Sequence, residues 1–314
     1  MIHIVNDLHG SKKLIDEVAA AISRMRRGDT IVINGDGAGA RGPVMNNLIK
    51  IYYEVRRGET SEEELYAALE AIIGEKPDFP KEWIFDSVHG GLFRALLAEK
   101  YQKFASCMED ELSKVLKETI EPLSEAAKKA GVKLVYVPGN GEITPRDFLT
   151  SRYNEEFAVD PEDRFYHKLN KEGFFEEYGI EYVPYVAKVD GAVLISTDLL
   201  DVDVEVAKLL LKDAVGDDVF KVVIAHYPPA ISPIGGAFDF WTPNKTDIKR
   251  TDALRAIVDG TNLDKNAQFF FGHIHLGVMS DEMASYPATM GFFAAKHQCI
   301  WVKPGTVITL KGSL

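Results

Sequence analysis

Short apolar runs recur along the chain, and polar or glycine-rich residues close each of them. The runs are rich in Val, Ile, Tyr and Phe and show little alternation, which is typical of strands buried on both faces. The clearest expected strands are residues 2–5, 30–33, 133–137, 221–225 and 268–271. Helical periodicity separates them, as in residues 12–27, so the pattern predicts a layered α/β fold.

The C-terminal third has a different pattern. Asp190-Gly191 stands between two apolar segments, 181–187 and 192–197, and predicts a β-hairpin. Three later segments, 284–289, 297–302 and 306–310, are expected to be consecutive antiparallel strands. We therefore expect one domain over residues 1–314, built as a mixed two-sheet sandwich flanked by helices.

Residues 43–130 are expected to form a helical insertion in this domain. Thr60 and Glu63 have the spacing of a capping box, and a long apolar helix face follows, which Pro122 is expected to end or bend. The insertion carries 12 Lys and Arg against 17 Asp and Glu, so it is a poor nucleic-acid clamp. It is a candidate lid over a site or a candidate surface for homo-oligomer formation.

Composition narrows the class of protein. Hydrophobic residues make up 46% and charged residues 27% of the chain, enough for a sizeable core. We expect no membrane span, because no apolar run approaches about 18 residues. We also expect no secretory signal, because the N-terminus has the pattern of a strand and lacks a basic start and a long apolar stretch. Cys107 and Cys299 are too few for a disulfide framework, which favours the cytoplasm. The net charge of −12 makes nucleic acid an unfavoured partner.

Five of the expected strands are followed by residues that bind metals. These residues are Asp7 and His9, Asp36, Asn140, His226, and His273 with His275. Open α/β sheets place their sites at the carboxyl ends of strands. Mixed carboxylate, imidazole and amide ligands suit Mn, Fe, Zn, Co or Ni better than calcium. A carboxylate can also bridge two cations about 3.5–4 Å apart.

The same residues form an ordered set of motifs. They read D-x-H at 7–9, G-D at 35–36, G-N at 139–140, a lone histidine at 226 and G-H-x-H at 272–275. In this order and content the chain resembles the calcineurin-like metallophosphoesterase superfamily, apart from the insertion. A Pro-Gly turn at 304–305 is similar to one in that family.

The resemblance implies a dinuclear centre with Mn as the favoured metal. Asp7, His9 and His275 would bind one ion, Asn140, His226 and His273 the other, and Asp36 would bridge them. It also implies hydrolysis of a phosphodiester or nucleotide-type phosphoester by a hydroxide held on the two ions. The substrate is expected to be a small phosphoester.

Two positions depart from the family pattern. Gly39 replaces a second acidic residue, and Gly141 stands where G-N-H would place a histidine. In the family this histidine contacts the phosphate and helps the leaving group depart. General acid help is typically worth about 10²–10⁴ in rate, so its loss favours leaving groups that need little protonation. If the missing histidine limits catalysis, Gly141→His should raise activity toward poor leaving groups.

Other polar side chains are candidates for the missing contact. Arg41, His89 and His297 could meet the phosphate or the leaving group, and His167 is a fourth candidate. Glu142 is expected to hold local backbone, and His3 to be structural.

Two alternatives to the enzyme remain in view. One is a catalytically weak or inactive protein on the same scaffold, which binds metal and phosphate and acts through its helical insertion. The other is a dinucleotide-binding loop at residues 35–39, which is disfavoured because Pro43 interrupts the helix that should follow.

Overall fold

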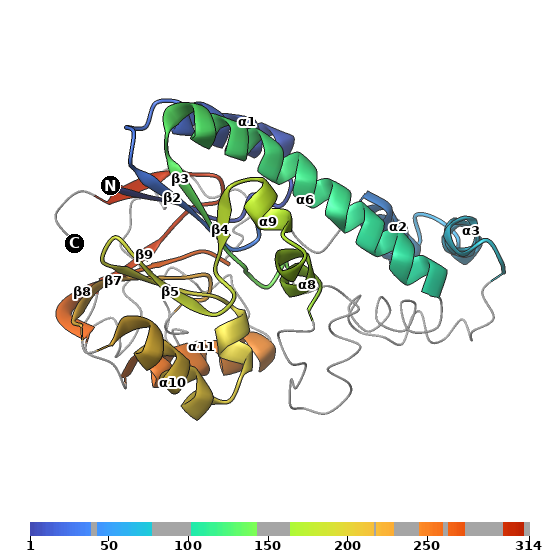
Figure 1. The fold of residues 1–314 in the computed structure, drawn as a ribbon. Helices are drawn as coiled ribbons and strands as arrows, with labels where there is room; N and C mark the ends of the chain where they lie inside the picture. The colour runs from blue at the N-terminus through green and yellow to red at the C-terminus, as the bar shows by residue number, and fades with distance from the viewer. Residues whose placement is uncertain are drawn as a thin grey trace.

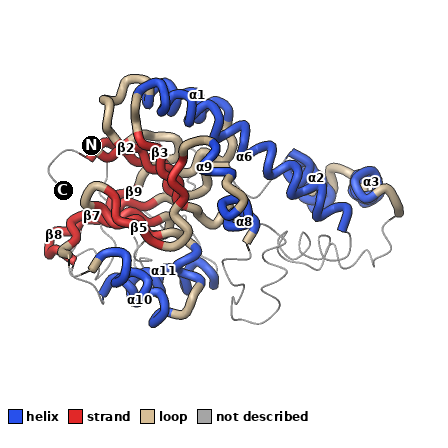
Figure 2. Tube along the Cα trace, viewed as in Figure 1, coloured by secondary structure: helices blue, strands red, loops and turns tan. Residues whose placement is uncertain are grey.

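The computed structural model describes residues 1–38, 43–76, 102–142, 164–216, 218–228, 245–259, 263–273 and 298–310. These residues form two five-stranded sheets between two layers of helices (Figure 1). Helices α1 (Lys12–Ile22) and α6 (Gln102–Ala130) cover the first sheet. Helices α10 (Val204–Val215) and α11 (Lys245–Asp259) cover the second (Figure 2). The α/β class and the mixed two-sheet arrangement expected from the sequence are confirmed.

The first sheet has the strand order β10-β1-β2-β3-β4. Its strands are β1 (Ile2–Val5), β2 (Thr30–Asn34), β3 (Lys133–Val137), β4 (Ile180–Tyr182) and β10 (Ile308–Leu310). Strands β1 to β4 are parallel, while β10 pairs antiparallel with β1. The carboxyl ends of β1, β2 and β3 therefore lie side by side.

The second sheet has the order β5-β6-β7-β8-β9. Its strands are β5 (Val186–Val189), β6 (Ala192–Ile195), β7 (Phe220–Ala225), β8 (Leu263–Phe271) and β9 (Gln298–Trp301). The predicted hairpin is confirmed between β5 and β6, where Asp190 and Gly191 have φ of 47° and 85°. Such a pair of positive φ angles is what a type I′ turn requires. The remaining pairs are parallel, so the ends of β7 and β8 are also adjacent.

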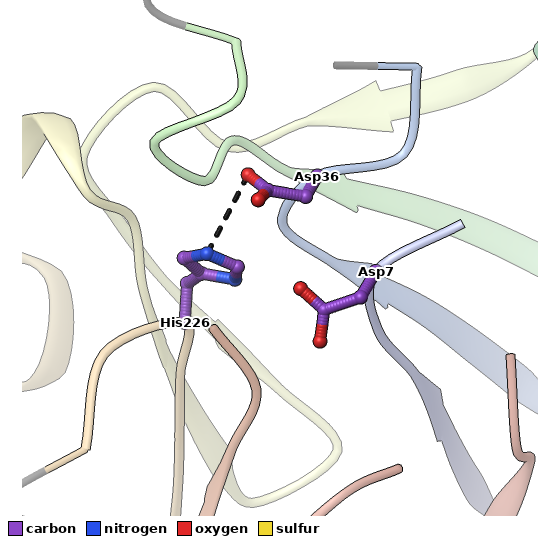
Figure 3. Close-up of side chains that lie close together, drawn as sticks. All are labelled: Asp7, Asp36 and His226. Carbon is purple, nitrogen blue, oxygen red and sulfur yellow. Dashed lines mark ion pairs between the residues drawn. The ribbon is translucent and has the colours of Figure 1, made fainter. Parts of the chain in front are cut away.

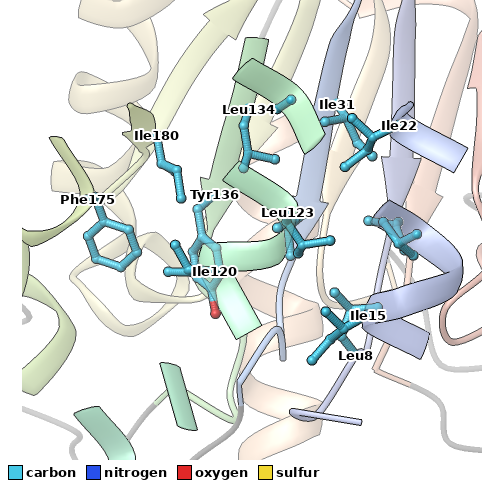
Figure 4. Packing of buried hydrophobic residues seen from close by; sticks show 14 of the residues in the cluster. Leu8, Ile15, Ile22, Ile31, Ile120, Leu123, Leu134, Tyr136, Phe175 and Ile180 are labelled. Atoms are coloured by element: carbon cyan, nitrogen blue, oxygen red, sulfur yellow. The ribbon is translucent and has the colours of Figure 1, made fainter. Parts of the chain in front are cut away.

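Alternate residues of the central strands pack into different layers, which explains their continuous apolar runs. Ile31 and Ile33 of β2 pack with residues of α1 and α6, and Figure 4 shows Ile31 in this cluster. Val32 packs instead with residues of the second sheet. Likewise, Ile224 of β7 lies between the sheets, and Val223 packs toward the outer helices. Both faces of both sheets are therefore buried.

The remaining helices lie at the edges of the sandwich or beyond it. They are α2 (Pro43–Arg56), α3 (Glu62–Ile73), α8 (Phe165–Lys171), α9 (Phe174–Glu177) and the 3₁₀ helix η2 (Asp198–Asp201). Helix α6 runs from the face of the first sheet outward to α2 and α3 (Figure 1). Within the described residues, no helix is both long and apolar enough to cross a membrane.

Two strand predictions were wrong. The expected strand at 181–187 is divided: β4 belongs to the first sheet and β5 to the second, so the chain changes sheets between them. The expected consecutive antiparallel strands are also in different sheets, because β9 pairs parallel with β8 and β10 pairs with β1. Residues 284–289 lie outside the described part.

Two helix-boundary predictions also need correction. Helix α3 has Ser61 as its N-cap, without a side-chain capping bond, so the Thr60–Glu63 capping box is not formed. Helix α6 continues through Pro122 and ends at Ala130, so Pro122 does not end the helix. Its neighbours Ile120 and Leu123 are buried against α1 and the first sheet, and this packing favours an unbroken helix over the local cost of proline.

Candidate metal centre

The loops that follow β1 and β2 are joined by backbone hydrogen bonds. The amide of Asp7 donates to the carbonyl of Gly35 at 3.2 Å, and the amide of His9 donates to the carbonyl of Asp36 at 2.8 Å. The amide of Gly10 donates in the same way to Gly37 at 2.9 Å. Because the two strands are parallel neighbours, these bonds carry their register beyond the strand ends and bring Asp7, His9 and Asp36 together.

Left-handed backbone is concentrated at this site. Five non-glycine residues in the described part have positive φ, and four of them are Asp7, His9, Asp36 and His273, with φ between 47° and 67°. Such conformations cost roughly 1–3 kcal/mol each and persist where the surrounding structure fixes them, often at functional sites. The chain therefore places the predicted ligands in a backbone geometry that ordinary strand ends do not need.

Asp36 lies between two groups of side chains. Its Oδ2 is 3.7 Å from Nε2 of His9, and its Oδ1 is 3.5 Å from Nε2 of His226. Asp7 lies on the His9 side, with Oδ1 at 4.0 Å from the same His9 nitrogen. Ligand atoms of Asp7, Asp36 and His226 all fall within 4.8 Å of one another (Figure 3). The two Asp36 oxygens thus face different neighbours, as a bridging carboxylate would.

Two imidazoles converge on Asn140, which follows β3. The side-chain oxygen of Asn140 is 2.8 Å from Nε2 of His226 and 2.6 Å from Nδ1 of His273. Ligands at about 2.0–2.2 Å from one cation lie about 3 Å apart when they are adjacent in its shell. The two distances from the Asn140 oxygen are slightly below that value, so all three atoms could serve one cation only after moving a little apart.

His226 is fully buried and oriented by the backbone. Its Nδ1 lies 3.2 Å from the carbonyl oxygen of Asn34, so this nitrogen carries the proton and Nε2 faces Asp36 and Asn140. Burial alone would lower the pKa of His226, but the charge and hydrogen bond of Asp36, followed by Asp7, raise it to about 9. Nε2 is therefore directed at negative charge, where a proton or a metal ion is favoured.

The donor set fits a divalent cation. Asp7, Asp36 and Glu142 are three carboxyl groups buried within one small region. Burying several negative charges together is costly unless cations compensate them. Imidazole nitrogen, carboxylate oxygen and amide oxygen together suit Mn, Fe, Co, Ni or Zn.

Glu142 holds local backbone, as expected from the sequence, and it also binds a loop that is distant in the chain. Its Oε2 accepts from the amides of Asp36 at 2.9 Å and Gly139 at 2.7 Å. Its Oε1 accepts from the amide of Gly37 at 2.8 Å and the hydroxyl of Tyr136 at 2.6 Å. Burial and the charge of Asp36 raise the pKa of Glu142 to about 7, against the effect of these hydrogen bonds. One side chain therefore joins the loops after β2 and β3.

Gly141 packs directly against Asp36. Its amide donates to Oδ1 of Asp36 at 2.5 Å. A Cβ atom at this position would lie 2.7 Å from the same oxygen and 2.8 Å from Cγ. Gly141 is therefore required by close approach to the carboxylate, and it contributes only backbone to the site.

The structure gathers six of the predicted ligands, which are Asp7, His9, Asp36, Asn140, His226 and His273. The seventh, His275, lies outside the described residues, as do Arg41, His89 and His297. His167 lies in another cluster, with Nε2 2.7 Å from Asp198. His3 is buried at a strand position, where its ring nitrogens face Asp29 and Thr309.

Sequence reasoning missed Tyr227, whose ring packs on His273 with centroids 4.2 Å apart. Its position directly after His226 was the available signal, but an apolar strand end gives no reason to single out one aromatic residue.

Comparisons with models of protein families, with curated proteins and with solved structures find no significant match for this chain. Its function is therefore inferred from the arrangement of its own side chains.

Proposed function

We propose that the protein is a metal-dependent phosphoesterase of the calcineurin-like type, acting on a small phosphodiester or nucleotide-type phosphoester. The observation that carries the proposal is the position of Asp36. One of its oxygens faces His9, and the other faces His226. A single carboxylate with imidazoles on both sides is the arrangement that a pair of cations needs.

Two groups of residues would hold the ions. Asp7 and His9 would bind the first, together with His275 by resemblance to the family. Asn140, His226 and His273 would bind the second, and Asp36 would bridge them. Manganese is the favoured metal, with Fe, Zn, Ni and Co as alternatives. Such a pair supplies a water activated near neutral pH and positive charge for the phosphoryl oxygens.

The residues of the chain keep this site in place before substrate arrives. Glu142 ties the backbone of Asp36 to that of Gly139, and the amide of Gly141 fixes one oxygen of Asp36. The carbonyl of Asn34 directs Nε2 of His226 inward. Groups held in this way need little reorganisation when charge develops in a transition state.

The substrate preference follows from Gly141. No side chain at this position can protonate a departing oxygen, so leaving groups of low basicity are favoured, such as nucleotides, pyrophosphates and aryl alcohols. The net charge of −12 further favours small phosphoesters over long nucleic acids.

A direct assay tests the proposal. The protein is stripped with a chelator, reloaded with Mn, Co or Ni, and tested on bis-p-nitrophenyl phosphate and p-nitrophenyl phosphate. We expect metal-dependent release of nitrophenol, with the diester preferred, and loss of that activity in His226→Ala. If the protein binds its full complement of metal but hydrolyses neither ester, the proposal that it is an enzyme is refuted.

A second candidate rests on the same glycine. Because Gly141 offers only backbone beside Asp36, the protein could bind metal and phosphate without turnover and act through its helical insertion. The same assay separates the two functions, since the binding protein would take up metal and phosphate but release no nitrophenol.

A further inference from the structure

A buried group of charged residues reaches the site from the side of the second sheet. It consists of Arg164, Asp198, Asp201 and Arg250, and His167 joins it through Asp198. None of these residues belongs to the predicted ligand set. Buried charges of this kind are costly and are often no better for stability than apolar side chains, so their presence calls for a role other than packing.

Tyr227 connects this group to the site. It is buried two residues after the end of β7, next to His226, and its ring lies on that of His273 with an interplanar angle of 31°. Its hydroxyl accepts a hydrogen bond of 2.8 Å from Nη1 of Arg250. The guanidinium carbon of Arg250 also lies 5.4 Å from the centre of the Tyr227 ring. The ring is therefore held at its hydroxyl end while its face supports a predicted ligand.

Asp201 fixes the arginine in turn. Its Oδ1 accepts from Nε of Arg250 at 2.6 Å, and its Oδ2 accepts from Nη2 at 2.5 Å. Asp201 also accepts from Nη2 of Arg164 at 2.8 Å. A two-point contact of this kind defines the plane of a guanidinium, which a lysine cannot reproduce. The position of Nη1, and with it that of Tyr227, is thereby set.

The two histidines predicted for the second cation site differ in burial and in their contacts, since His226 is fully buried and His273 is partly exposed. A backbone carbonyl directs the ring of His226, whereas the face of Tyr227 supports the ring of His273. Removing an outer contact that orients a ligand typically lowers metal affinity or activity about 10- to 100-fold.

We infer that Tyr227 is a positioning residue which, held by Arg250 and Asp201, sets the ring plane of His273 for the second cation. This inference rests on the metal centre of the proposed function. It adds a chain of contacts from α11 and η2, on the outer side of the second sheet, to the predicted cation site at the carboxyl ends of the strands.

Cobalt(II) binding to the full-length protein tests the inference without depending on turnover. Dissociation constants are measured by titration, and the visible absorption of the bound ions reports their geometry. Tyr227→Phe removes the hydroxyl but keeps the ring, and Arg250→Lys removes the two-point contact. We expect each to weaken the second cobalt site about 10- to 100-fold and to change its spectrum, as outer contacts of metal ligands usually do.

Arg164→Lys is the matched control. It alters a buried arginine of the same cluster that contacts Asp198 and Asp201 but is separated from Tyr227 by both Asp201 and Arg250. It should lower stability and leave the cobalt spectrum unchanged. Tyr227→Phe preserves side-chain volume, so it provides a folded variant even if Arg250→Lys is unstable.

The outcomes separate this inference from the proposed function. If folded Tyr227→Phe has the cobalt affinity and the visible spectrum of the wild type, the inference is overturned and the proposed enzymatic function is unaffected. An identical spectral change in Arg164→Lys would also overturn it, since a merely structural cluster gives that result. If Tyr227→Phe weakens cobalt binding but the wild-type protein hydrolyses no ester, the positioning role of Tyr227 is supported and the proposed enzymatic function is refuted. A wild-type protein that binds no cobalt would overturn both.

Discussion

The amide of Gly141 donates a hydrogen bond of 2.5 Å to Oδ1 of Asp36, the carboxylate that lies between His9 and His226. Through this contact, the backbone of Gly141 holds the Asp36 carboxylate in position. The position lacks a side chain because the carboxylate of Asp36 occupies the space beside it.

Replacing Gly141 should therefore damage the centre. A Cβ atom would lie 2.7 Å from Oδ1 of Asp36, so Gly141→Ala must displace the carboxylate or the loop. We expect metal affinity to fall about tenfold or more in both Gly141→Ala and Gly141→His, with lower activity on every ester. This reverses the expectation from sequence alone that a histidine would help.

Gly58→Ala is a suitable control for that experiment. Gly58 has φ of 69° with open space around its Cβ position, so alanine there costs about 1 kcal/mol of stability without touching the site. Its metal affinity should equal that of the wild type. Higher activity of Gly141→His on alkyl phosphomonoesters would show that the carboxylate tolerates the side chain.

His226→Ala should remove one cation. Its ring is buried and faces both Asp36 and Asn140, so its loss removes a predicted ligand from the centre of the group. We expect the metal content to fall by one ion per chain and the activity to fall more than the roughly 10- to 100-fold typical of outer contacts. Elemental analysis and the nitrophenyl assay provide both readings.

His3→Ala is the matched control for a buried histidine outside the centre, because His3 faces Asp29 and Thr309. It should lose stability but keep both ions. Equal metal content in the two variants would mean that His226 is not a ligand.

The metal-free protein should lose stability as pH rises from about 6.5 to about 9. The pKa of His226 is raised to about 9 from the ordinary 6.5, so the folded state holds this proton more tightly than the unfolded state. The resulting stabilisation is complete below pH 6.5 and is lost as pH rises through the folded pKa. Urea unfolding at several pH values, with chelator present, measures it.

His226→Asn should flatten this part of the pH profile. Glu142 contributes with the same sign at lower pH, since its pKa is raised from 4.5 to about 7. A slope between pH 6.5 and 9 that is unchanged in the variant would assign the effect to another group.

Glu142→Gln should loosen the loops around the ions. A carboxylate accepts from all three amides and the Tyr136 hydroxyl, whereas the NH₂ group of Gln cannot accept from the pair of donors it would face. With about 1–3 kcal/mol for each buried donor left without an acceptor, the loss should be several kcal/mol. Chemical unfolding of the metal-free protein measures this loss in the free energy of unfolding.

Tyr136→Phe is a smaller change to the hydrogen bonds of Glu142. It removes one of the four donors and keeps the ring that packs on Phe175 and Tyr182. We expect a loss of about 1 kcal/mol and little change in metal affinity. A Glu142→Gln protein no less stable than Tyr136→Phe would contradict the role given to Glu142.

The sequence was most informative where function depends on strand ends. A ligand that directly follows a parallel strand is placed by the sheet itself, so Asp7, Asp36 and His226 could be grouped from the pattern alone. Contacts between residues far apart in the chain could not be found in this way. The hydrogen bonds from Asp36 to Glu142 and from Arg250 to Tyr227 span 106 and 23 positions, and no local periodicity records them.

Predictions of the fold were wrong where the local sequence pattern is compatible with more than one strand pairing. The segment at 181–187 reads as one strand, yet its first part pairs with β3 and its last part with β6. Apolar residues suit either sheet, so only the completed sandwich decides where the chain changes sheets. The positive φ angles of the ligands were equally hidden, because Asp and His usually adopt ordinary backbone.

Helix α6 spans 29 residues, or about 44 Å, and is shared by two parts of the molecule. Near its middle, Val115 and Thr119 are the side chains that a Cβ at Gly10, the residue after His9, would approach. A force applied at the end beside α2 and α3 would therefore act on the loop that carries His9. Helix α6 therefore connects α2 and α3 at one end with the loop of a predicted ligand near its middle, so excising α2 and α3 would remove contacts at the far end of the helix and leave those near Gly10 in place.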